Sequence, residues 1–188
     1  TLNSTELLYA QYQGEFISTG KKIANEQSDF FEKIFGEKTI SRMLDLNFIL
    51  QIRTTLEHGI YFSSDSEIED YIKLYNETYE NKSIMYETIT NGFFTFKALK
   101  FKMDSIFYKK AASFTLIVEL CKRKKILNIA LLSTKLNEFE EHLLKNKNKD
   151  SETNHYAQFY LYIYQGTASK KARDFRGNMI GNILDNIG

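Results

Sequence analysis

The chain of 188 residues contains no proline at all and a single cysteine, Cys121. Proline interrupts helices and is common in turn-rich sheet proteins, so its absence favours long uninterrupted helices over a turn-rich sheet. A single cysteine cannot form an internal disulfide, which excludes a disulfide-stabilised scaffold and fits a reducing, cytoplasmic compartment. We therefore expect Cys121 to be a small buried apolar residue.

The sequence also lacks a membrane-spanning run and the common cofactor motifs. Its longest apolar stretch, residues 111–121 (AASFTLIVELC), is too short to cross a bilayer and contains Glu119, so we expect no membrane partner. The three histidines, His58, His142 and His155, do not have the spacing of metal ligands, and no glycine-rich nucleotide-binding loop is present. These absences predict no metal and no cofactor in this chain.

The remaining composition, 43% hydrophobic and 26% charged residues, is typical of a globular protein. Apolar periodicity and capping residues predict an all-α fold, a bundle of about eight or nine helices without a substantial sheet, in a single domain over residues 1–188. The segment at about 39–59 is apolar on nearly every side of a helix, and "SIFYKKAASFTLIVELCKRKK", about residues 105–125, has the pattern of a second core helix that ends in a basic tail. Such helices lie in the centre of a protein, so we expect both in the core.

Capping residues predict where the later helices begin. Ser133 and Thr167 are expected to cap the helices that follow them, because a hydroxyl can accept a hydrogen bond from the exposed first-turn amides. Residues 155–167 (HYAQFYLYIYQGT) fit neither the helical nor the strand period and are compatible with either structure.

Charge is distributed unevenly along the chain. Residues 1–94 contain eight Lys and Arg against 15 Asp and Glu, whereas residues 95–188 contain 17 against nine, a net charge of −7 and then +8. The two halves can attract each other in the fold, or the basic half can bind an anionic partner such as duplex DNA. No aromatic residue is interleaved with the two basic clusters, so neither offers a platform for base stacking. The candidate phosphate-binding residues are Lys122, Arg123, Lys124, Lys125, Lys170, Lys171, Arg173 and Arg176.

Two short strings resemble nuclease motifs. Asp70 followed by Glu80 and Lys82 is similar to the D…E-x-K arrangement of magnesium-dependent restriction nucleases, but that chemistry needs carboxylates that converge from a sheet. The string from Arg53 to His58 (RTTLEH) resembles the R-x4-H motif of HEPN ribonucleases, which are also all-α and cleave RNA without a metal. The alternative structural reading is an ion-paired Arg53 and a His58 that interacts favourably with the C-terminal end of its helix.

Three segments together resemble a further family, the GmrSD-type restriction proteins. "LNSTELLYAQYQGEFI" is similar to the family's "LN-x-x-EL-x-x-A-x-x-x-GEFI", and "RMLDLNFILQI" is similar to its "RM-x-D-x-x-x-x-L" helix. "QGTASKKARDFR" resembles its closing "GT…R…R" segment. The three occur in the family's order, between about residues 2 and 176.

The resemblance implies the helical region of a larger, NTP-dependent restriction or phage-defence protein. Such proteins have an N-terminal ParB-like domain with a D-G-Q-Q-R motif, which this chain lacks, so no catalytic residue of the family can be placed here. We expect the chain to be a fragment that packs on a ParB-like domain and contacts DNA; a HEPN-like ribonuclease and a non-catalytic interaction scaffold are the alternatives. The motif positions, expected to be structural, are Glu6, Gly14, Glu15, Phe16, Arg42 and Asp45.

Overall fold

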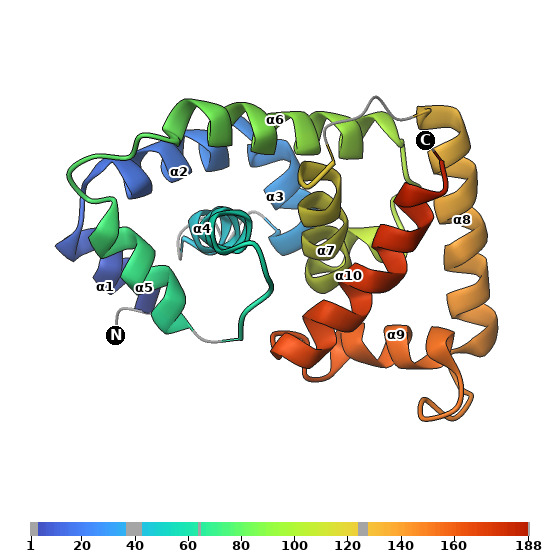
Figure 1. Cartoon of the computed structure of the whole chain (residues 1–188). Coiled ribbons are helices and arrows are strands. Elements are labelled where there is room, and N and C mark those ends of the chain that lie inside the picture. Colours follow the sequence, from blue (N-terminus) through green and yellow to red (C-terminus); the bar gives the residue numbers. More distant parts are fainter. Residues whose placement is uncertain (1–3, 37–42, 64, 124–127, 188) are drawn as a thin grey trace. The chain divides into compact units, whose positions relative to one another are not determined.

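The computed structural model describes residues 4–36, 43–63, 65–123 and 128–187. Within these residues the predicted all-α class is confirmed: there are ten α-helices and a short 3-10 helix, η2, and no strand. The helix count exceeds the predicted eight or nine. The helices are α1 (Ser4–Gln11), α2 (Glu15–Glu26), α3 (Ser28–Phe35), α4 (Leu44–His58), α5 (Asp65–Leu74), α6 (Lys82–Ala98), η2 (Ile106–Tyr108), α7 (Lys110–Cys121), α8 (Ile129–Asn146), α9 (His155–Tyr164) and α10 (Lys170–Asp185) (Figure 1).

These helices form two compact units. The first unit comprises Thr1–Ile60 and Ser64–Phe93, and the second comprises Tyr61–Ser63 and Phe94–Gly188. The sequence predicts a single domain because it contains no linker. One boundary between the units lies between Phe93 and Phe94, inside the continuous helix α6. Because no loop occurs there, the sequence contains no linker composition that would indicate this boundary.

The first unit is built around α4, which Figure 1 shows end-on with α1, α2, α3 and α5 around it. The expectation of a central helix is confirmed for its described part, because Leu46 and every residue from Phe48 to Thr55 are buried. Aromatic rings pack together on one side of α4. The ring centroids of Phe31 and Phe48 are 5.5 Å apart, and those of Phe30 and Phe93 are 4.9 Å apart.

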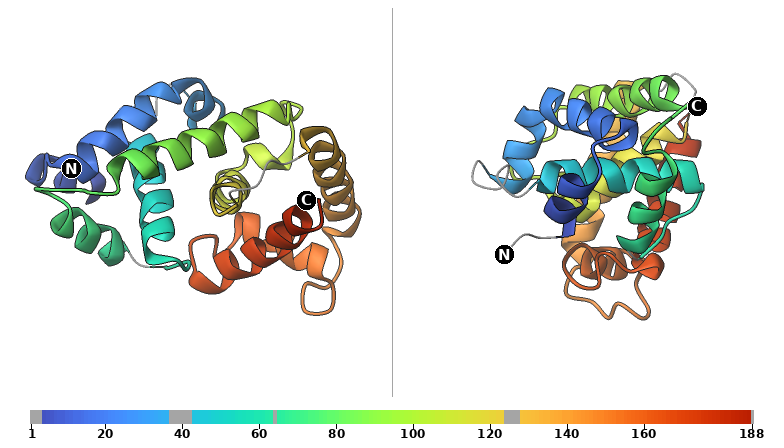
Figure 2. Two further views of the ribbon diagram at one scale, coloured as in Figure 1. Left: turned by 45° about the horizontal axis from the view of Figure 1, so that its top comes forward. Right: turned by 90° about the vertical axis from the view of Figure 1, so that its left-hand side faces the viewer.

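The second unit is built around α7, which packs against α9, α10 and η2 (Figure 2). Every residue from Ala111 to Cys121 is buried, as expected of a helix that is apolar on all sides. The ambiguous segment 155–167 begins with helix α9. The aromatic-rich helix packs on α8, α7 and α10. These tertiary contacts favour a helix over a strand, which the sequence pattern alone does not distinguish.

Two predicted caps are wrong. Helix α8 begins four residues before Ser133, where Asn128 Oδ1 accepts a hydrogen bond from the Leu131 amide at 3.1 Å. Helix α10 is capped by Ser169 instead of Thr167, since Ser169 Oγ accepts from the Ala172 amide at 3.2 Å. In both cases a capping residue lies close to the predicted one, and sequence alone does not decide between them.

Candidate functional site

Arg176, one of the predicted phosphate-binding residues, lies in the interior of the second unit and is 1% exposed. Its Nη1 donates to the Tyr162 carbonyl at 2.6 Å, its Nη2 to the Thr167 carbonyl at 2.8 Å and its Nε to Thr115 Oγ1 at 3.1 Å. Burial, followed by the positive charge of Arg173, lowers the pKa of Arg176 to about 10. Arg176 therefore joins α7, α9 and α10, and no phosphate can reach it in this arrangement.

Arg173 is also buried, in contrast to the exposed position that phosphate binding requires. Its Nη1 donates to the Phe62 carbonyl at 2.7 Å. The guanidinium lies over two rings, 5.2 Å from the centroid of Phe62 and 5.0 Å from that of Phe114. Such contacts stabilise a cation that has been removed from water. Arg173 thus holds the Tyr61–Ser63 segment to the rest of the second unit.

Arg123 binds the carboxylates of two acidic residues. Its Nη1 donates to Glu119 Oε2 at 2.8 Å, and its Nε and Nη2 donate to the two oxygens of Asp185 at 2.9 and 3.1 Å. The neighbouring Lys122 is exposed and pairs with Glu119 Oε1 at 2.9 Å. The first basic cluster therefore connects the end of α7 to the end of α10. Its other two members, Lys124 and Lys125, lie outside the described residues.

Lys170 and Lys171, at the start of α10, are the two members of the second cluster that lie on the surface. Lys170 pairs with Asp174 at 2.5 Å, one helical turn along α10. The cluster of four that the sequence predicts is thus divided: two lysines face solvent and two arginines face the core.

A different basic surface, which the sequence motifs do not indicate, lies between α6 and α7. We call it the lysine segment; it spans residues 97–110 and contains one acidic residue, Asp104. Its five lysines are all exposed, and three of them, Lys100, Lys102 and Lys109, form no ion pair within the described part of the chain. The lysines are Lys97, Lys100, Lys102, Lys109 and Lys110.

Helix α8 fixes the lysine segment in place. Glu140 accepts a hydrogen bond from Ser105 Oγ at 2.8 Å and another from the Ile106 amide at 2.6 Å. Seven residues earlier on the same face of α8, Ser133 Oγ donates to the Leu99 carbonyl at 3.3 Å. Seven residues after Glu140, the same helical face ends at the exposed Lys147, about 10 Å further along the axis. The segment is therefore an ordered strip, and Lys147 extends its positive charge.

The Arg53–His58 pair does not form a catalytic arrangement. Arg53 is 0% exposed; its Nη1 donates to the Phe16 carbonyl and, at 2.8 Å, to Thr19 Oγ1. His58 lies on the surface at the end of α4, where its Nδ1 is 3.3 Å from the hydroxyl of Tyr71. The two side chains thus contact different elements of the first unit, and no described contact joins them.

Burial, which is the largest cause, lowers the pKa of Arg53 to about 10. Its Nε and Nη2 have no hydrogen-bond partner in the described part of the chain. The guanidinium instead lies 4.9 Å from the ring centroid of Phe16 and 5.4 Å from that of Tyr79. The alternative reading of an ion-paired Arg53 is wrong, because Arg53 forms no ion pair within the described residues; Glu57, one turn further along α4, accepts from the Tyr79 hydroxyl at 2.6 Å.

The Gly14–Phe16 motif positions lie at a close contact between α2 and the loop that precedes α6. A Cβ atom on Gly14 would lie 1.7 Å from the Asn76 carbonyl oxygen, so only glycine fits there. Glu15 accepts from the Tyr79 amide at 2.7 Å and from Lys82, and these two bonds lower the pKa of its carboxyl, the Lys82 bond most. Phe16 is buried beneath them. The contacts of these positions are structural.

The other motif positions and the second nuclease-like string contribute no further site. Asp45 lies in the first turn of α4, where its Oδ1 accepts from the Leu46 amide at 2.8 Å, and Glu6 is half-buried in α1. Arg42 lies outside the described residues. Asp70 and Glu80 are exposed on the surface, and Lys82 is engaged with Glu15. Within the described residues, no three His, Cys, Asp or Glu side chains are grouped as a metal site requires.

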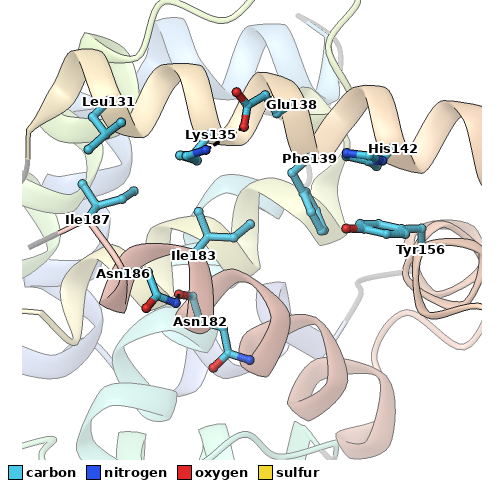
Figure 3. Close-up of a pocket in the computed structure, with 10 residues that line it drawn as sticks. All are labelled: Leu131, Lys135, Glu138, Phe139, His142, Tyr156, Asn182, Ile183, Asn186 and Ile187. Atoms are coloured by element: carbon cyan, nitrogen blue, oxygen red, sulfur yellow. Dashed lines mark hydrogen bonds and ion pairs between the residues drawn. The ribbon is translucent and has the colours of Figure 1, made fainter.

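A groove of about 350 Å³ lies between α8 and α10 in the second unit (Figure 3). Its apolar lining comes from Phe139, Ile183 and their neighbours. At one end the ring of His142 stacks on that of Tyr156, with the ring centroids 5.1 Å apart and an interplanar angle of 18°. The two charged residues of the lining, Lys135 and Glu138, pair with each other at 2.9 Å. The groove therefore has no excess charge with which to select a partner. It is lined by Leu131, Lys135, Glu138, Phe139, His142, Tyr156, Asn182, Ile183, Asn186 and Ile187.

Among the described helices, none is both long enough and apolar enough to cross a membrane. In comparisons with known proteins, no family model, no curated protein and no solved structure matches the chain. The feature of the described residues with the clearest chemistry is the lysine segment, because the exposed ammonium groups of Lys100, Lys102 and Lys109 form no ion pair within the described part of the chain and can bind phosphate.

Proposed function

We propose that the chain is the helical accessory domain of a GmrSD-like, NTP-dependent restriction protein for phage defence, and that it contacts duplex DNA. In this proposal the chain itself is not catalytic. The catalytic chemistry belongs to the parent protein, whose ParB-like domain is the partner on which this region packs. The resemblance of the three ordered motifs supports the family assignment.

The observation that carries the DNA contact is the lysine segment. Lys100, Lys102 and Lys109 are exposed, while Arg123, Arg173 and Arg176 are bound to carboxylates, carbonyls or rings. Lysine ammonium groups bind phosphates as point charges and give largely sequence-independent affinity. The interface that we propose therefore lies on the strip from Lys97 to Lys110, with Lys147 beyond it.

Binding of the full chain to labelled duplex DNA over a salt series tests this proposal. The triple variant K100Q/K102Q/K109Q is expected to weaken binding and to reduce the slope of log K against log salt by up to about 2.7, because each phosphate that is no longer neutralised reduces the slope by about 0.9. The matched control is K135Q/K170Q/K171Q, which removes the same charge from exposed lysines outside the strip. It is expected to retain most of the affinity.

Three results would contradict the proposal in different ways. Equal weakening by both triple variants would show long-range attraction without a defined interface. Full binding by K100Q/K102Q/K109Q would place the DNA elsewhere on the chain. No detectable binding at about 50 mM salt, where phosphate contacts are strong, would remove the DNA role and leave an interaction scaffold, which binds a ParB-like domain but no nucleic acid.

The ribonuclease alternative makes an opposite prediction. A HEPN-like enzyme loses metal-free RNA cleavage in His58→Ala, whereas the buried position of Arg53 and the surface position of His58 favour an inactive chain. We expect neither the wild type nor His58→Ala to cleave RNA. Cleavage that is present in the wild type and lost in His58→Ala would establish the enzyme and overturn our proposal.

A further inference from the structure

Two unusually exposed apolar side chains accompany the lysine segment: Phe94 lies just before it and Met103 lies within it. Phe94 is 74% exposed and Met103 is 72% exposed, the two highest values among the large apolar residues that the structure describes. Phe94 is the one phenylalanine in the described part of the chain that faces solvent; its neighbour Phe96 is 1% exposed. A single exposed apolar residue is ordinary on a protein surface, but here two of them accompany Lys100, Lys102 and Lys109, which form no ion pair within the described part of the chain.

Phe94 lies beside the positive charge. It precedes Lys97 by three residues on α6, and side chains with this spacing are neighbours on a helix surface, about 5–6 Å apart at Cβ. The helix ends at Ala98, and Lys100, with a left-handed φ of 51°, begins the turn that leads to Lys102 and Met103. An aromatic face and several ammonium groups are thus presented together over a few residues.

We propose that this surface binds single-stranded nucleic acid, with a base stacked on Phe94 and the neighbouring phosphates on the lysines. This inference rests on the proposed nucleic-acid role of the lysine segment and specifies its preferred form. In a duplex the faces of the bases are covered by their neighbours, so an exposed ring gains little there. In a single strand each base has an accessible face, and stacking on an aromatic side chain contributes strongly to affinity.

The surroundings of Phe94 on α6 favour nucleic acid over an anionic membrane surface. Membrane-associated helices present a continuous apolar face above a basic one. On α6, the residue one turn before Phe94 on the same face is the exposed Asn91, and the residue one turn after it is Lys97. On α6 the ring is therefore flanked by polar side chains on both sides, which suits the stacking of one base and does not provide the continuous apolar face that inserts into lipid.

Fluorescence anisotropy with labelled oligothymidine and with duplex DNA of the same length tests the inference on the full chain. Phe94→Ala is expected to weaken single-strand binding about tenfold and to leave duplex binding within about twofold of the wild type. Phe94→Tyr, which keeps an aromatic face, is expected to retain single-strand affinity. The control is Leu74→Ala, which truncates an exposed apolar side chain of the first unit and is expected to change neither.

The outcomes separate this inference from the function on which it rests. If Phe94→Ala binds single strands as well as the wild type, the stacking role is wrong, even where K100Q/K102Q/K109Q still shows that lysines bind DNA. If the wild type binds neither form, the proposed function fails together with the inference. If Phe94→Ala instead loses binding to phosphatidylserine vesicles but retains single-strand binding, the surface binds membranes and the inference is overturned. Because Phe94 is exposed, the thermal unfolding of its variants should match that of the wild type.

Discussion

The hydroxyl of Tyr61 donates a hydrogen bond to Glu119 Oε1 at 2.7 Å, and both side chains lie against the backbone of Gly177. Glu119 is buried, and it also accepts from Lys122 and Arg123 at 2.9 and 2.8 Å. A buried carboxylate is costly unless donors satisfy it, and here three side chains do so. The close approach of α10 to α7 at Gly177 leaves the space in which this arrangement fits.

Gly177→Ala should therefore destabilise the protein. A Cβ atom at this position would lie 2.5 Å from Tyr61 Cε2, closer than real side chains approach, so Tyr61 or α10 must move. We expect a loss of about 1–3 kcal/mol in the free energy of unfolding, measured by urea denaturation. Asn178→Ala, on the exposed side of the same helix, is the control and should stay within about 0.5 kcal/mol of the wild type.

A double-variant cycle identifies the cause of that loss. In a Tyr61→Ala background the ring that obstructs the new methyl group is absent, so Gly177→Ala should cost much less there than in the wild type. An equal cost in both backgrounds would show that the substitution acts through something other than contact with Tyr61.

Arg176→Met should destabilise the protein strongly, although a surface arginine would tolerate the change. The substitution removes the donors to the part-buried carbonyls of Tyr162 and Thr167 and to the buried hydroxyl of Thr115. We expect a loss of about 3 kcal/mol in the free energy of unfolding, compared with less than about 0.5 kcal/mol for the exposed Lys171→Met. Unchanged stability with weakened DNA binding would instead restore Arg176 to the surface role that the basic cluster suggests.

The sequence contains a signal for the burial of Arg176 that counting charges hides. Ile180 and Leu184 follow Arg176 at four and eight residues, and Ala172 precedes it by four, so all four lie on one stripe of α10. The stripe is buried, and Arg176 is buried with it. Helical position therefore predicts the role of a basic residue better than membership of a basic cluster does.

The lysine segment has no comparable signal in the sequence. Its lysines are distributed over the end of α6, the turn that follows, the residue after η2 and the start of α7, so they share no helical period. They form one ordered strip because Glu140, 34 residues after Ile106, binds the turn. Local patterns predicted the central helices α4 and α7, whereas a surface assembled by a distant hydrogen bond needs the tertiary structure.

Cys121 should be unreactive in the folded protein. Burial raises the pKa of its thiol from 9.0 to about 12, so almost no thiolate, the reactive form, exists near neutral pH. With a thiol-specific reagent at about pH 8, we expect no labelling of the native chain and complete labelling in denaturant. Ser83→Cys, which places a thiol at an exposed position of α6, is the control and should be labelled at once on that one cysteine. Rapid labelling of Cys121 in the native wild type would mean that the end of α7 opens readily.

Stability should fall at alkaline pH because of Tyr61. Burial, together with the negative charge of Glu119, raises the pKa of its hydroxyl well above 10.0. Below about pH 10 the hydroxyl is protonated in both the folded and unfolded chains, so this contribution to stability is fully present. Above about pH 10 the unfolded chain releases the proton and the folded chain does not, so the free energy of unfolding decreases by up to about 1.4 kcal/mol per pH unit.

Urea denaturation at a series of pH values from about 8 to 11, around the ordinary pKa of tyrosine, measures this dependence. Tyr61→Phe loses the bond to Glu119 and should be less stable than the wild type at neutral pH, but its stability should fall less steeply above about pH 10 because one proton is no longer released on unfolding. Burial and the bond to Glu57 also raise the pKa of Tyr79, so Tyr79→Phe should reduce the slope as well, and the double variant should reduce it further. A Tyr61→Phe curve that runs parallel to the wild type throughout this range would mean that Tyr61 ionises normally in the folded chain and is not held against Glu119 in solution.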